Sequence, residues 1–151
     1  MKRGRIWFYS SLMVTLFTIL LLVTGSALLT LAIDKSNTIP FGTFITWAGM
    51  ISLPLSIYWG IEELRSPKGA FISFLSKSLK VIILLAILWV PISYLLAGNL
   101  SFSFSEKETF QGGQIAMRWF WRISYGIGLG AVLILTLYWI SLLFKTVDDK
   151  S

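Results

Sequence analysis

The sequence predicts an all-α integral membrane protein, and three observations lead to this fold class. Of the 151 residues, 56% are hydrophobic and only 13% are charged, whereas about a quarter of an average soluble domain is charged. Four apolar runs each match the roughly 20 residues that a helix needs to cross about 30 Å of hydrocarbon. None of them alternates as barrel strands do, so helices are the structure in which a lipid-embedded backbone satisfies its own hydrogen bonds.

The four predicted transmembrane helices form one domain, residues 1–151. Their approximate spans are 6–33, 41–61, 71–97 and 119–144. The basic start MKRGR fits a signal peptide, but the uncharged stretch after it is much longer than the usual apolar region of roughly 7–15 residues. We therefore expect the first helix to be retained. Short connections place sequence neighbours side by side, which favours an antiparallel four-helix bundle with a longer outer loop at 98–117.

Basic residues near helix ends favour the cytoplasmic side of a membrane. If the N-terminus is inside, nine of the 13 lysines and arginines are cytoplasmic and four are outside. The sequence thus predicts that both termini are cytoplasmic, in a membrane of the bacterial cytoplasmic type. The net charge of +6 is then a topology signal and an attraction to anionic lipids. It does not predict nucleic-acid binding, because no soluble basic domain is present to hold a nucleic acid.

Several chemistries are disfavoured by composition. The sequence has no cysteine and no histidine, so it lacks thiol nucleophiles and the commonest metal ligand. Ionisable groups are almost missing at membrane depth, which argues against proton coupling. The one tight acidic pair at a predicted helix end, Glu62 and Glu63, is explained by a salt bridge to Arg65 or Lys68 at the membrane edge. We expect no enzymatic activity, no cofactor and no metal site.

Small and polar residues form a stripe along the second span. At 100° per residue one arc holds Gly42, Thr46, Gly49, Ser52, Ser56, Gly60 and Glu63. Small residues let helix backbones approach closely and hydroxyls bond across the contact, so we expect this face to meet another helix and the opposite face to meet lipid. The first span has a weaker matching stripe of Ser11, Thr15, Thr18, Gly25 and Ser26. A polar permeation path is the alternative interpretation.

Two prolines and several aromatic residues mark further positions. Pro54 and Pro91 each remove a backbone donor, so a carbonyl four residues earlier needs another partner. Tryptophans such as Trp47 and Trp89 fall where an interfacial aromatic belt is expected. We interpret most of these rings as membrane anchors.

The stretch RWFWR opens the fourth span. Arg118 and Arg122 are followed at the same spacing by Gly126 and Gly130, which predicts that the arginines lie above a GxxxG helix contact and lean toward packed protein. Trp119, Phe120 and Trp121 are expected to fan out among the lipid headgroups. The guanidinium groups suit carboxylates of the outer loop, Asp34, a lipid phosphate, or a partner.

The outer loop contains an alternating apolar pattern. Leu100, Phe102 and Phe104 are separated by serines, a period of two that suits a strand or an extended segment lying on the membrane. Both a loop resting on lipid and a surface for a partner fit this pattern.

The absence of internal chemistry leads to an interaction hypothesis. We expect a non-enzymatic subunit, assembly factor or modulator of a larger membrane complex, bound to another integral membrane protein or to copies of itself, and to lipids. The alternatives are a small transport or channel component that works as an oligomer and an immunity protein against a membrane-active peptide. The candidate interaction residues are Arg118, Trp119, Trp121, Arg122, Gly126, Gly130, Gly49, Ser52, Ser56, Phe102 and Phe104.

Overall fold

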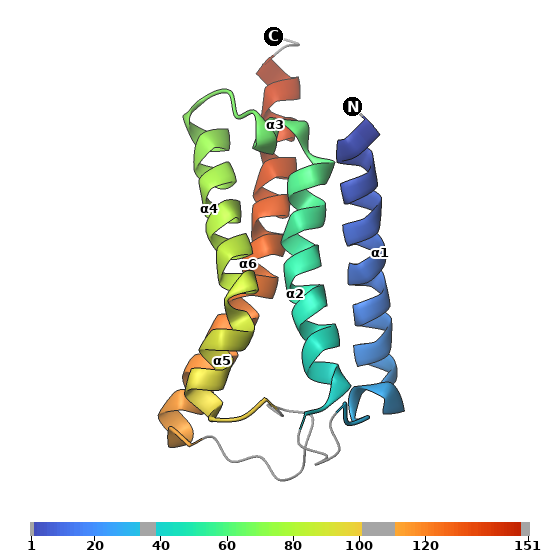
Figure 1. Ribbon diagram of the computed structural model, residues 1–151. Helices are drawn as coiled ribbons and strands as arrows, with labels where there is room; N and C mark the ends of the chain where they lie inside the picture. Colours follow the sequence, from blue (N-terminus) through green and yellow to red (C-terminus); the bar gives the residue numbers. More distant parts are fainter. Residues whose placement is uncertain (1, 34–38, 101–110, 149–151) are drawn as a thin grey trace.

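The computed structural model describes residues 2–33, 39–100 and 111–148, with the backbone alone described at 2 and 145–148, and this part of the chain is helical (Figure 1). The elements are α1 (Lys2–Thr24), η1 (Ala27–Leu29), α2 (Phe41–Gly60), α3 (Glu62–Arg65), α4 (Ala70–Ile87), α5 (Trp89–Ala97) and α6 (Gly113–Asp148). Four of them, α1, α2, α4 and α6, are long and apolar enough to cross a membrane. The prediction of four such helices is confirmed, and the fold is compatible with an integral membrane protein.

The first helix is shorter than the predicted span. α1 ends at Thr24 and not at Ile33, because Gly25 takes a left-handed conformation with φ of 58°. The amide of Ser26 then donates to the carbonyl of Leu21 at 3.1 Å, and the amide of Gly25 donates to Leu22 at 3.3 Å. This is the Schellman arrangement that ends many helices at glycine.

The predicted third span is interrupted at Leu88, which separates α4 from α5. Pro91 has no amide hydrogen, so it leaves the carbonyl of Ile87 without its helical donor. The indole nitrogen of Trp47 on α2 donates to this carbonyl at 3.2 Å and to that of Ala86 at 3.0 Å. Trp47 thus stabilises the break in a neighbouring helix, which the interpretation as a membrane anchor did not include. α2 itself continues through Pro54.

The fourth helix begins earlier than predicted and continues further. α6 starts at Gly113 and has 36 residues, or about 54 Å at 1.5 Å per residue, which exceeds the roughly 30 Å of hydrocarbon. The predicted outer loop at 98–117 is therefore shorter at its C-terminal end. Phe102 and Phe104 lie outside the described residues.

α2 is the central helix of the protein. Figure 1 shows α1 on one side of it and α4 and α6 on the other, with both termini and α3 at the same end of the molecule. In α2, 44% of the apolar window is buried, against 22% in each of the other three long helices. The expectation that the face of α2 opposite its small-residue stripe meets lipid is wrong, because that face packs against α4 and α6.

Two apolar clusters fill the space between α2, α4, α5 and α6. The one nearer the termini contains Ile57, Leu64, Leu75, Leu79, Ala131, Ile134 and Tyr138. The other contains Ala86, Trp89, Ala97, Phe120 and Ile127. Trp89 is only 2% exposed, and its indole nitrogen donates to the Ser124 hydroxyl at 2.8 Å. The interpretation of Trp89 as an interfacial anchor is therefore wrong.

Candidate functional site

The small-residue stripe of α2 is covered by α1. The side chain of Thr18 lies against Gly49 so closely that a Cβ there would be 2.8 Å from the Thr18 Cβ. The hydroxyls of Thr15 and Ser52 are 2.9 Å apart, and both residues are buried. The predicted pairing of two small and polar helix faces is confirmed for α1 and α2.

This contact, which we call the α1–α2 seam, is internal to the chain. The Thr18 hydroxyl donates across it to the carbonyl of Ile45 at 3.3 Å. Ser56, also buried, donates to the carbonyl of Leu53 in its own helix. Gly49, Ser52 and Ser56 were candidate interaction residues, and in this structure α1 already occupies their face.

The RWFWR stretch presents its cations away from the core. The buried positions of α6 follow one another as Ala116, Phe120, Ser124, Ile127, Ala131, Ile134 and Tyr138. At 100° per residue, Arg118 and Arg122 lie on the opposite side of the helix, and both are exposed. The prediction that the arginines lean toward packed protein is wrong within this chain. Phe120 is the ring that packs inward, at 3% exposure, whereas it was expected among the headgroups.

Aromatic contacts occur along the RWFWR stretch, and one of them involves an exposed guanidinium group. The Arg122 Cζ atom lies 5.4 Å from the centre of the Trp119 ring, close enough for a cation–π contact. Trp121 stacks on Tyr125 with ring centres 5.5 Å apart. The acidic residues that we expected to pair with the arginines, Glu106, Glu108 and Asp34, lie outside the described residues.

The glycines of α6 fall into two groups. A Cβ built at Gly130 would lie 2.9 Å from Ile82 Cδ1. The glycine therefore leaves room for this side chain of α4. At Gly126 and Gly128 no atom of the described residues lies within 4 Å of that position. Within the described part of the chain, only the Gly130 half of the predicted GxxxG contact is therefore made, and the Gly126 half is open.

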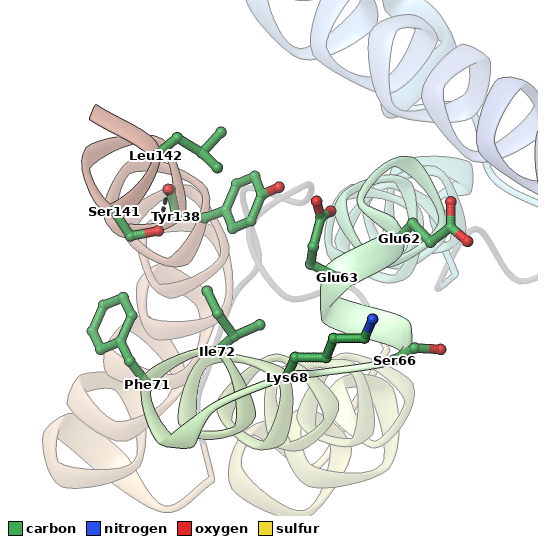
Figure 2. Close-up of a pocket in the computed structure, with 9 residues that line it drawn as sticks. All are labelled: Glu62, Glu63, Ser66, Lys68, Phe71, Ile72, Tyr138, Ser141 and Leu142. Carbon is green, nitrogen blue, oxygen red and sulfur yellow. Dashed lines mark hydrogen bonds between the residues drawn. The ribbon is translucent and has the colours of Figure 1, made fainter. Parts of the chain in front are cut away.

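A cavity of about 690 Å³ lies between the start of α4, α3 and α6. Figure 2 shows the Tyr138 ring pointing from α6 toward the Glu63 carboxylate, while Glu62 points away. The sequence assigned Glu63 to a salt bridge, and it contained no signal that a tyrosine so distant along the chain would face it.

The polar groups of this cavity can hydrogen-bond, but they do not form a metal centre. The carboxylate of Glu63, the amine of Lys68 and the hydroxyls of Ser66 and Ser141 line it together with apolar side chains. Among the described residues, no group of three or more acidic side chains could hold a metal ion. No family model, curated protein or solved structure matches this chain.

Proposed function

We propose that this chain is a non-enzymatic multi-pass membrane protein that serves as a subunit, assembly factor or modulator of a larger membrane complex. It lies in a bacterial cytoplasmic membrane with both termini in the cytoplasm. It binds another integral membrane protein through the side of α6 that carries Arg118, Arg122 and Gly126, which we call the α6 outer face.

The open space at Gly126 is the observation that supports this proposal. Glycine inside a helix is about 1 kcal/mol less favourable than alanine, and in membrane helices small residues gather where another helix packs closely. Gly49 and Gly130 have such a neighbour inside the chain. Gly126 and Gly128 have none among the described residues. Only Gly126 lies on the same side of α6 as the two exposed arginines, so we infer that a helix from another molecule packs at Gly126.

The positive charges of the α6 outer face indicate which side chains the partner carries. Arg118 and Arg122 are exposed on the same side of α6 as Gly126. Their planar guanidinium groups bind carboxylates with two parallel hydrogen bonds. We therefore expect the partner helix to carry a small-residue groove and an acidic side chain near its outer end. Trp119 and Trp121 flank this contact, and the loop residues Phe102 and Phe104 remain predicted additions to it.

The experiment compares two glycines of α6. Gly126→Leu fills the open space on the outer face. Gly128→Leu adds the same side chain about 160° away around the helix, where no described atom lies within 4 Å either. Each variant is extracted in mild detergent and its complexes are weighed by native mass spectrometry. We expect a stoichiometric partner to be lost from Gly126→Leu and retained by Gly128→Leu.

Two results would overturn the proposal. If both variants retain the partner equally, the α6 outer face does not bind it. If the purified chain is a homo-oligomer that conducts solute into liposomes, the transport function replaces the proposed one. Thermal unfolding of each variant, expected at or above the temperature of the original chain because leucine favours the helix more than glycine, excludes a general loss of fold as the cause.

A further inference from the structure

A second cavity, of about 390 Å³, lies between the first turns of α1 and the end of α2. Its polar lining includes Arg5, Tyr9, Glu62 and Arg65, and Trp59 forms an aromatic wall. In the sequence these residues lie on separate segments, and the packing of α1 along α2 brings them together. We call this cavity the arginine pocket.

Arg65 is positioned by an aromatic ring and a glycine. Its Cζ atom lies 5.5 Å from the centre of the Trp59 ring. On the other side its Nη1 atom comes so close to α1 that a Cβ at Gly4 would be 3.1 Å away. The Arg65 Nε atom is buried without a hydrogen-bond partner among the described residues. This N–H group of the guanidinium therefore remains as a donor for a ligand.

The charge of the arginine pocket suits a singly charged anion. Arg5 and Arg65 contribute two positive charges and Glu62 contributes one negative charge, which leaves a net charge of +1. Arginine binds phosphate oxygens with several hydrogen bonds in a fixed geometry. One phosphodiester group carries one negative charge and several acceptor oxygens, so it neutralises the pocket.

The surroundings indicate a lipid as the source of this phosphodiester. The pocket lies at the shared end of two helices that are long enough to cross a membrane. Trp7 stacks on Trp59 with ring centres 6.5 Å apart, and tryptophan is enriched at membrane interfaces. Headgroup phosphates lie at the same depth.

An exposed apolar track continues from the pocket along α1. Arg5 and Tyr9 are followed at intervals of three or four by Met13, Leu16 and Leu20, so these residues share one helix face. The exposed fractions of the last four are 62%, 75%, 59% and 59%. An acyl chain that descends from the pocket can lie along this face.

We propose that the arginine pocket binds an anionic phospholipid of the surrounding leaflet, with its phosphodiester held by Arg5 and Arg65 and its acyl chains along α1. The lipid fills the space between α1 and the end of α2 and joins the two helices at that end. This site is separate from the α6 outer face, so either proposal can fail without the other.

The test uses the full chain in detergent, with lipid binding measured by native mass spectrometry. The probes are phosphatidylglycerol, zwitterionic phosphatidylcholine and inorganic phosphate. We expect phosphatidylglycerol to bind more tightly than phosphatidylcholine, and Arg65→Gln to weaken phosphatidylglycerol by about tenfold, because charge-assisted hydrogen bonds are lost. Arg65→Lys should be intermediate. Lys77→Gln removes an exposed positive charge on α4 and should change binding less than about twofold.

Three outcomes would overturn the inference. Equal binding of the two lipids, unaffected by Arg65→Gln, means that lipid only coats the protein. Competition by inorganic phosphate as strong as that by phosphatidylglycerol means that the pocket takes free phosphate. Equal weakening by Arg65→Gln and Lys77→Gln means that overall charge attracts the lipid. If Arg65→Gln proves unstable, Arg5→Gln gives the same comparison, because Arg5 is exposed in the first turns of α1.

Discussion

The α1–α2 seam and the core between α2, α4, α5 and α6 hold the same central helix by different means. In the seam, Gly49 admits Thr18, and the hydroxyls of Thr15 and Ser52 meet at 2.9 Å. In the core, large side chains such as Trp89 and Leu79 are almost completely buried. α1 has no comparable contact with α4 or α6.

In a lipid environment the two contacts are stabilised in different ways. Lipid is as apolar as a leucine side chain, so helices associate there through close packing and hydrogen bonds rather than through the hydrophobic effect. A large apolar residue therefore stabilises helix association by fitting closely into the space between the helices. A small residue stabilises it by letting two helix backbones come close together, and the α1–α2 seam depends on this close approach.

The largest effect is expected from the core. Trp89→Ala removes a ring that is 2% exposed and the donor to Ser124, and truncating a buried aromatic side chain costs about 3–5 kcal/mol of unfolding free energy. Denaturant titration of the detergent-solubilised protein measures this loss. The matched control is Trp119→Ala, whose ring is 51% exposed. Similar losses for both variants would contradict the buried position of Trp89.

A smaller effect is expected when the seam is overpacked. Gly49→Leu places a side chain where Thr18 already lies, and overpacking costs about 1–3 kcal/mol. Because α1 contacts mainly α2, we expect α1 to separate while the core stays folded. The chain has no cysteine, so a disulfide between Thr15→Cys and Ser52→Cys reports the distance.

The yield of this disulfide should fall in the Gly49→Leu background. It should be unchanged with Gly126→Leu, which adds the same side chain to an open position of α6. An unchanged yield in both backgrounds would show that α1 does not depend on close approach at Gly49.

The smallest effect is expected from the hydroxyl pair. A double-mutant cycle with Thr15→Val and Ser52→Ala measures the coupling of the two side chains, and such couplings in membrane proteins average about 0.6 kcal/mol. Each hydroxyl also lies within hydrogen-bond distance of a carbonyl in its own helix, that of Ser11 for Thr15 and that of Gly49 for Ser52. Because each hydroxyl has one hydrogen, the one that donates across the seam shares or gives up its bond to its own helix. The cycle removes the effect of these bonds from the measured coupling energy. A coupling energy of zero would mean that the seam is stabilised by packing alone.

The predicted elements and the observed ones differ mainly at their ends and in their orientation. The stop at Gly25 had a local signal, because glycine is the usual residue after a helix, but the apolar residues beyond it suggested a longer span. The inward direction of Phe120 and the outward direction of Arg118 had no local signal. The sequence of α6 is compatible with either side of the helix facing the core. The neighbouring helices decide which side is buried.

Length, hydropathy and residue size are local properties, so the four apolar helices and the small-residue faces of α1 and α2 could be predicted from the sequence. The central place of α2, the burial of Trp89 and the meeting of Arg5 and Arg65 in one pocket became evident when the helices were packed together. Apolar side chains suit both lipid and protein interiors. Hydrophobicity therefore cannot distinguish the two surfaces of a membrane helix, and only the packing of neighbouring helices does.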